Sequence, residues 1–109
     1  LLQEFVERRL HLYSEDRNEP ERHGSSTLSP YLHFGNVSPH EVFLKIAQAC
    51  SWDESRLAKP NEKMTGFWNM DPNAEAFLDQ LLTWRELSYN MCWRERNHDK
   101  YESLPEWAQ

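Results

Sequence analysis

Glycine, cysteine and long apolar runs are all scarce in this chain, and each scarcity excludes a class of protein. The 109 residues contain three glycines, with neither a GxGxxG dinucleotide fingerprint nor a GK[ST] phosphate loop. Cys50 and Cys92 lie far apart with no CxxC or Cys/His spacing, so we expect two buried thiols of a reducing compartment and neither a disulfide framework nor a zinc site. No apolar run approaches the roughly 20 residues that cross a bilayer, and no signal pattern opens the chain. We therefore expect a cytosolic or nuclear protein with no membrane segment.

Basic residues are also in the minority. Lys and Arg number 12 against 18 Asp and Glu, which gives a formal net charge of −6. A domain that binds nucleic acid normally has the opposite balance, so composition alone disfavours DNA, although charge can be spread unevenly over the faces of a larger protein. The five histidines share no metal-ligand spacing, so we predict no metal site and interpret them as surface or capping residues. The chain begins without Met inside an apolar-periodic segment, and we expect it to be part of a longer polypeptide.

The periodic segments have the spacing of helices, and none alternates as a strand does. Residues 1–14 carry an apolar stripe that includes Phe5, Arg9 and Tyr13, followed by a polar connecting loop. The strongest helix is predicted to begin at Asp71-Pro72 and to end at the polar loop of residues 96–100. Two stripes at helical spacing run side by side along it. They comprise Phe77, Leu81, Trp84, Ser88 and Met91, and Leu78, Leu82, Arg85, Tyr89 and Cys92.

Two Ser-Pro pairs mark further helix starts. Ser29-Pro30 predicts a capped turn through Phe34 that Gly35 ends with a positive φ. Ser38-Pro39 predicts a capping box and a helix over residues 39–50. A short helix is also expected around Asp53 to Leu57. The predicted class is all-α, with about five helices.

Four hydroxyl side chains occupy five positions at the first of these turns: Ser25, Ser26, Thr27 and Ser29. With the backbone N–H groups that open the turn, they can donate to phosphate oxygens at the positive end of a helix. The alternative is ordinary capping, because Ser and Pro begin helices in many proteins.

A second polar group lies in the stretch "TWREL" of the last helix. Trp84 offers a ring on which a base can stack, and Arg85 offers a planar cation for anions or carbonyl groups. In the alternative interpretation, Trp84 belongs to the core and Arg85 pairs with a carboxylate such as Glu86 or Asp79.

Taken in order, these segments resemble the flavin-binding helical domain of the photolyase/cryptochrome family. The ordered set is a helix ending in Tyr13, then Arg17, Asn18 and Pro20, then "SSTLSPYLHFG", "VSP" and "FLDQLLTWREL". The resemblance covers nearly the whole chain. It implies that residues 1–109 form roughly the first half of that helical domain, with the antenna-binding α/β domain and the second half of the flavin site outside them.

The resemblance also implies roles for individual residues. Tyr13 would pack on bound FAD, Arg85 would lie near the flavin, and Arg17 would contact DNA. Trp84 would stack against a flipped pyrimidine dimer, and Gln80 lies near the position of the glutamate that bonds the dimer in repair enzymes of the family. The pyrophosphate of FAD would be held by hydroxyl and backbone N–H groups of Ser25, Ser26, Thr27, Leu28 and Ser29.

The implied activity is light-driven repair of cyclobutane pyrimidine dimers by electron transfer from reduced FAD, with damaged DNA as partner and an antenna chromophore of open identity elsewhere. Two other functions stay open. A cryptochrome-type light receptor is favoured by the missing acid near Gln80, and a cofactor-free helical interaction module would suit the acidic balance. The subclass also stays open, because "WRE" resembles one branch, whereas "REL" with the later "YESLPEWA" resembles the class II branch.

Overall fold

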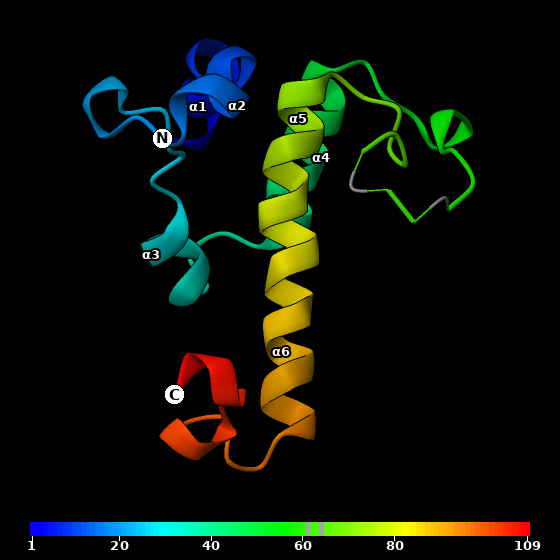
Figure 1. Ribbon diagram of the computed structural model, residues 1–109. Coiled ribbons are helices and arrows are strands. Elements are labelled where there is room, and N and C mark those ends of the chain that lie inside the picture. The colour runs from blue at the N-terminus through cyan, green and yellow to red at the C-terminus, as the bar shows by residue number, and fades with distance from the viewer. Residues whose placement is uncertain (61, 64) are drawn as a thin grey trace.

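The computed structural model describes residues 1–60, 62, 63 and 65–109, and the regular structure within them is helical, without strands. The α-helices are α1 (Leu2–Arg8), α2 (Tyr13–Asp16), α3 (Ser29–His33), α4 (Pro39–Ala49), α5 (Pro72–Leu78) and α6 (Arg85–Arg94). Short 3-10 turns and a π-helical segment, Asp79–Trp84, join or extend them. Figure 1 shows α5, the π-helical segment and α6 as one long rod. The prediction of an all-α chain is confirmed.

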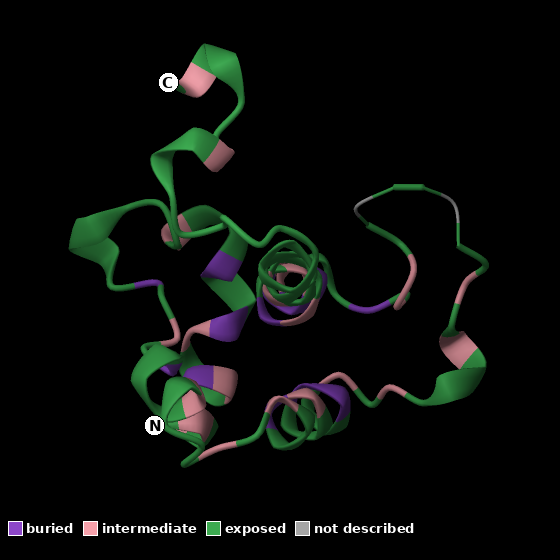
Figure 2. Ribbon diagram, turned by 90° about the horizontal axis from the view of Figure 1, so that it is seen from below, coloured by how far each residue is buried: buried purple, intermediate pink, exposed green. Residues whose placement is uncertain are grey.

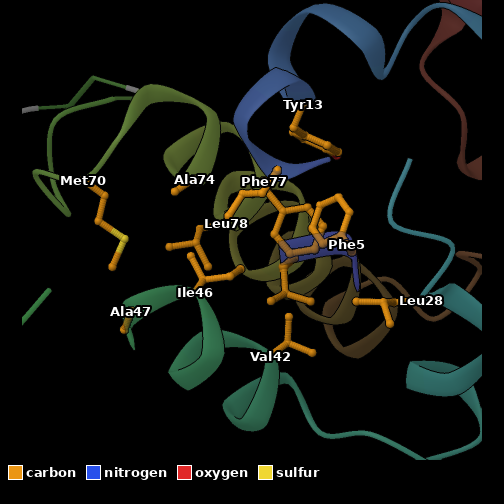
Figure 3. Packing of buried hydrophobic residues seen from close by; sticks show 12 residues of the cluster. Phe5, Tyr13, Leu28, Val42, Ile46, Ala47, Met70, Ala74, Phe77 and Leu78 are labelled. Carbon is orange, nitrogen blue, oxygen red and sulfur yellow. The ribbon is translucent and has the colours of Figure 1, made fainter. Parts of the chain in front are cut away.

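The core lies where α1 packs against α4 and α2 packs against α5. Three aromatic rings form its centre (Figure 3): Phe77 lies 4.8 Å from Phe5 and 5.2 Å from Tyr13, centroid to centroid, with the Tyr13 ring edge-on. Edge-to-face pairs are a favoured aromatic geometry, and full burial of a side chain such as Phe5 contributes about 1.5–3 kcal/mol to folding. This packing fixes the position of the Tyr13 ring.

Hydrogen bonds from one side chain lock α2 onto α5. The Asn73 amide oxygen accepts from the backbone N–H of Ser14 at 2.9 Å and from its hydroxyl at 2.6 Å, and the amide nitrogen donates to the carbonyl of His11 at 2.8 Å. Asn73 thereby holds both ends of the turn that presents Tyr13.

The first predicted helix is interrupted, which corrects the expectation of one helix through residue 14. Helix α1 ends at Arg8, a 3-10 turn covers Leu10–Leu12, and α2 begins at Tyr13. A 3-10 turn has about 3.0 residues per turn, so it rotates the side chains that follow it relative to α1. Phe5 and Tyr13 both stay buried, whereas Arg9 leaves the apolar face for polar partners described below.

The two Ser-Pro pairs differ in how they begin their helices. Ser38 caps α4 as predicted, with its hydroxyl accepting from the backbone N–H of Glu41 at 3.1 Å. Ser29 does not cap α3: it is the first helical residue, and the cap position falls on Leu28, without a side-chain hydrogen bond. The predicted Ser29 cap is therefore wrong, because Leu28 already has helical dihedral angles, φ −84° and ψ −12°. Gly35 has the expected positive φ, +72°.

The segment between α4 and α5 is mostly irregular, and Asn61 and Met64 within it lie outside the described residues. The helix expected at residues 53–57 is a 3-10 turn, Glu54–Arg56. The buried carboxylate of Glu75 holds the end of this segment against α5. It accepts hydrogen bonds from the backbone N–H groups of Gly66 at 2.5 Å and Met70 at 3.2 Å.

The long rod is buried only over its first half. Figure 2 looks along the rod and shows buried residues on it and on the helices beside it. Phe77, Leu78 and Leu81 are buried, but α6 has no buried residue. The apolar stripes continue in sequence through Met91 and Cys92, but both residues are exposed, so the stripes do not reach the core of the described structure beyond the π-helical segment. Cys92 is exposed and Cys50 half-buried, which corrects the expectation of two buried thiols.

Candidate functional site

A pocket of about 480 Å³ lies between the serine-rich loop (residues 23–29, which lead into α3), α2 and the middle of the long rod. Its lining consists of Tyr13, Ser25, Ser26, Thr27, Ser29, Leu32, Phe77, Gln80, Leu81 and Arg85. The pocket thus brings together most of the residues singled out in the sequence, from segments that are far apart along the chain. One wall carries hydroxyl groups, and the other carries the amide of Gln80 and the guanidinium of Arg85, with aromatic and aliphatic side chains between them.

The hydroxyl groups of the serine-rich loop differ in their availability. The Thr27 hydroxyl donates to the carbonyl of Ser26 at 2.7 Å, and the Ser26 hydroxyl accepts from the backbone N–H of Leu28 at 3.3 Å. Those of Ser25 and Ser29 make no hydrogen bond to other described residues, and both side chains line the pocket. Ser25 and Ser29 can therefore donate to a ligand without breaking an existing bond.

The loop backbone is unusual at one position before the hydroxyl run and at one position within it. His23 and Thr27 have positive φ angles of 49° and 57°, a backbone region that residues other than glycine seldom adopt. Gly24 is buried, and a Cβ atom added to it would lie 2.5 Å from the carbonyl carbon of Asp16. Only glycine allows this close approach of the loop to the end of α2.

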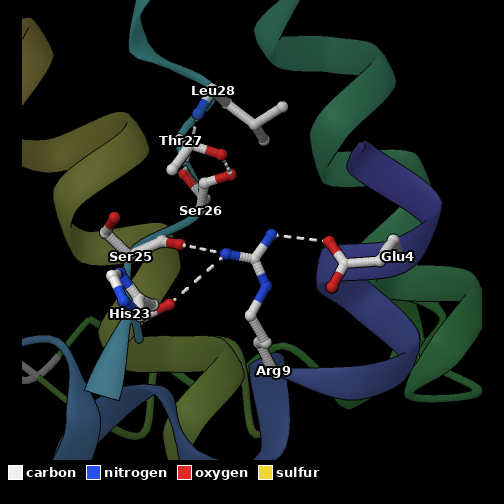
Figure 4. A network of polar contacts seen from close by, with 7 residues as sticks. All are labelled: Glu4, Arg9, His23, Ser25, Ser26, Thr27 and Leu28. Carbon is white, nitrogen blue, oxygen red and sulfur yellow. Dashed lines mark hydrogen bonds and ion pairs between the residues drawn. The ribbon is translucent and has the colours of Figure 1, made fainter. Parts of the chain in front are cut away.

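Arg9 supports this loop, and the sequence analysis missed that role by placing Arg9 on an apolar stripe. Figure 4 shows its guanidinium between the loop and α1. Nη1 donates to the carbonyl of Ser25 at 2.7 Å and more weakly to that of His23 at 3.4 Å, while Nη2 pairs with Glu4 Oε2 at 2.6 Å. A charged residue at an apolar position was the only local signal for this contact, since the loop carbonyls lie 14 and 16 positions further along the chain.

The π-helical segment supplies the opposite wall. It carries Gln80 and Leu81, and Arg85 follows directly. Single π turns within α-helices are rare and occur frequently at functional sites. Arg85 also lines a second, mostly apolar hollow of about 510 Å³ with Phe43, Trp52 and Trp68, so it borders both hollows. Its predicted alternative partner Glu86 is only loosely paired, at 3.9 Å.

Arg17, Trp84 and Leu28 lie outside the pocket lining. Arg17 borders an adjoining hollow of about 300 Å³ that shares Tyr13, Ser25 and Gln80 with the pocket. The Trp84 side chain is half-exposed, and its indole N–H donates to Asp79 Oδ2 at 3.0 Å, so it is not a core residue. Leu28 is buried in the core, which leaves only its backbone for a ligand.

Among the residues that line the pocket, Tyr13 has a pKa that its surroundings shift. Burial raises the pKa of its phenol, and the hydrogen bond and positive charge of Arg17 oppose that shift in part. The Arg17 guanidinium lies 5.8 Å from the centre of the Tyr13 ring. The phenol therefore stays protonated at neutral pH and can donate a hydrogen bond.

Within the described part of the chain, no group of three or more His, Cys, Asp or Glu side chains has an arrangement that could hold a metal ion. Among the same residues, no helix has the length and apolar character needed to span a bilayer.

Comparisons with known proteins give a consistent set of relatives. The deoxyribodipyrimidine photo-lyase of Potorous tridactylus is 30% identical over 109 residues, which is all of this chain and 17% of that protein. The enzyme of the same name from Arabidopsis thaliana is 34% identical over 105 residues, or 95% of this chain and 18% of that protein. Cryptochrome-2 of Arabidopsis thaliana is 44% identical over 43 residues, covering 39% of this chain and 7% of that protein. The chain therefore matches one segment of proteins of the photolyase/cryptochrome family.

The match to the photolyase/cryptochrome family confirms the resemblance drawn from the sequence. The chain spans 17% to 20% of the length of the photolyases it matches. No family model and no solved structure matches it. The relatives include both photolyases and a cryptochrome, so the comparisons leave the class within the family open.

Proposed function

We propose that these residues form part of the FAD site of a DNA photolyase that uses light to split cyclobutane pyrimidine dimers, and that they are roughly the first half of its helical FAD-binding domain. The observation that supports this most strongly is the pocket itself. Hydroxyl groups from residues 25–29, the Tyr13 ring, Gln80 and Arg85 converge there although they come from three separate segments. Ordinary capping would not require that convergence, and Ser29 does not cap its helix.

The chemistry of the pocket fits the two halves of an FAD molecule. The hydroxyls of Ser25 and Ser29, which have no partner among the described residues, would donate to pyrophosphate oxygens, and Arg85 would supply positive charge within a chain whose net charge is −6. Tyr13, Phe77 and Leu81 would provide apolar and aromatic surface for the rings. When bound, reduced FAD would supply the electron that opens the dimer.

The same site offers groups for the damaged bases and their backbone. Gln80 faces the pocket and can form a neutral hydrogen bond to a dimer, and Trp84 presents a half-exposed ring for stacking. Arg17, beside the adjoining hollow, would contact a phosphate. A dimer stacks and pairs poorly, which lowers the cost of extruding it from the duplex and favours damaged over intact DNA.

A blue-light receptor of the cryptochrome type is the second candidate. It would use the same FAD site but would signal through a protein partner. The observation that favours it is the neutral Gln80 in the pocket, combined with an Asp79 carboxylate that is already bonded to Trp84. No carboxylate therefore lines the described pocket where a dimer would need one.

The test uses the complete polypeptide that carries these residues. We expect it to purify with flavin absorbance and to lose that absorbance when Ser25→Ala and Ser29→Ala are combined. Ser51→Ala is the matched control, because Ser51 is an exposed serine outside the pocket. A colourless wild-type protein that also fails to take up added FAD would overturn both candidates and favour an interaction module.

Illumination then separates repair from signalling. A photolyase would convert dimer-containing single-stranded DNA to intact pyrimidines under blue light, as followed by chromatography of the products. A flavin-containing protein that leaves the dimers unchanged would overturn the repair proposal and support the receptor.

A further inference from the structure

We propose that Arg9 is a positioning residue for ligand binding: its guanidinium, anchored by Glu4, holds the serine-rich loop in the conformation that presents the Ser25 hydroxyl to the pocket and thereby sets the affinity for a diphosphate group. The identity of that ligand as FAD rests on the proposed function. The contact between Arg9 and the loop does not.

The two terminal nitrogens of the Arg9 guanidinium connect the serine-rich loop to α1. Nη1 of Arg9 donates to the Ser25 carbonyl at 2.7 Å, while Nη2 pairs with Glu4 at 2.6 Å. Figure 4 shows the Ser25 carbonyl directed toward the guanidinium and its hydroxymethyl group directed away from it. The hydrogen bond to the backbone of Ser25 therefore fixes the direction of the side chain that lines the pocket.

The loop needs such a restraint from outside. His23 and Thr27 flank the held carbonyl and have positive φ angles. Non-glycine residues persist in that region only where surrounding contacts impose it. Arg9 contacts the carbonyls of His23 and Ser25, so it restrains the first strained residue and the first hydroxyl-bearing residue together.

Arg9 is also placed at an energetic cost, which argues against a position selected for stability alone. Its Nε is buried and has no hydrogen-bond partner within the described residues. An unpaired buried donor is unfavourable. A lysine would avoid that cost, but its single ammonium group lacks the planar fork that joins a carboxylate on α1 to a carbonyl of the loop.

The experiment compares Arg9→Lys with Arg8→Lys in the complete polypeptide. Arg8 is the exposed neighbour on the same helix, so the two variants make the same chemical change at a bonded and at an exposed position. The first measurement is amide hydrogen exchange of residues 24–28 in flavin-free protein. We expect faster exchange in Arg9→Lys and no change in Arg8→Lys, whereas equal protection in all three proteins would overturn the proposal.

The second measurement is the dissociation constant for FAD together with the urea midpoint of unfolding. Loss of a charged hydrogen bond that orders the loop should weaken FAD binding by about 10- to 100-fold. Glu4→Gln should bind nearly as the wild type does, because an amide oxygen can still accept from Nη2, whereas Glu4→Ala should resemble Arg9→Lys. FAD affinity that falls only in proportion to the unfolding midpoint would show a general structural role and overturn the positioning role.

The two proposals fail in different ways. If the wild-type protein binds no FAD, the proposed function fails, and the exchange measurement still decides whether Arg9 orders the loop. If the wild type binds FAD and Arg9→Lys binds it equally well, only the role of Arg9 fails.

Discussion

The indole N–H of Trp84 donates to the carboxylate of Asp79 at a distance of 3.0 Å, within the π-helical segment Asp79–Trp84. Residues five apart are hydrogen-bonded neighbours in a π turn, whereas an α-helix brings residues three or four apart together. The local change of helix type therefore makes this pair possible. It holds the Trp84 side chain at the rod surface, and it engages the carboxylate that precedes Gln80 in the sequence.

This relationship predicts a graded effect on binding of damaged DNA. Trp84→Ala should weaken binding of a dimer-containing oligonucleotide by about 1–3 kcal/mol, the range typical of base stacking. Asp79→Ala should cost less, because the ring remains but loses its restraint, and Asp79→Asn should change little, because an amide oxygen also accepts from the indole. Binding curves by fluorescence anisotropy measure all three. Unchanged binding in Trp84→Ala would remove Trp84 from the site.

The two Ser-Pro helix starts predict that loss of a serine hydroxyl lowers the stability of the protein at one of them and leaves it nearly unchanged at the other. Ser38→Ala should lower the free energy of unfolding by about 1 kcal/mol, because it removes the bond from the Glu41 N–H. Ser29→Ala should stay within about 0.5 kcal/mol of the wild type, because Ser29 caps nothing. Urea denaturation measures both, and equal losses would contradict the assignment of Leu28 as the cap position.

Gly24 is predicted to tolerate no side chain, because a Cβ atom at this position would lie too close to Asp16. Gly24→Ala should destabilise the protein by roughly 1–3 kcal/mol, since its Cβ would meet Asp16 backbone atoms that cannot move aside easily. Gly35→Ala is the control: apart from Gly35 and its chain neighbours, no atom of the described residues lies within 4 Å of its Cβ position, and the positive φ resists the change, at about 1 kcal/mol. Thermal unfolding compares the two. A smaller loss at Gly24 than at Gly35 would contradict the close approach.

Tyr13 predicts a loss of stability at alkaline pH. Burial raises the pKa of its phenol in the folded protein above the ordinary value of 10.0. The unfolded chain therefore releases this proton first as pH rises, so the phenol's contribution is complete below about pH 10 and is lost as pH climbs through the folded pKa. Tyr13→Phe keeps the ring and should flatten the fall in unfolding free energy above about pH 10. An unaltered alkaline profile in this variant would show that another group causes the loss.

Much of the local structure was predictable because its causes are local. Ser38-Pro39 and Asp71-Pro72 begin helices where expected, since a capping side chain and a fixed φ act within one turn. Gly35 adopts the positive φ expected after α3. The errors arose at Arg9, where a distant contact competed with periodicity, and at Cys92, which lies on α6, a helix with no buried residue in the described structure.

The order of residue types along the chain determined that the protein is helical, where most of its helices begin, and that hydroxyls gather before α3. Those properties depend on neighbours within a few positions. Tertiary structure alone decided that Ser25 and Ser29 meet Tyr13, Gln80 and Arg85 around one pocket, and that Arg9 supports the loop from behind. Such contacts join residues that are far apart in the sequence: Arg9 and Ser25 are 16 positions apart, and Ser14 and Asn73 are 59 apart. Periodicity describes neighbours within a few positions and therefore cannot predict them.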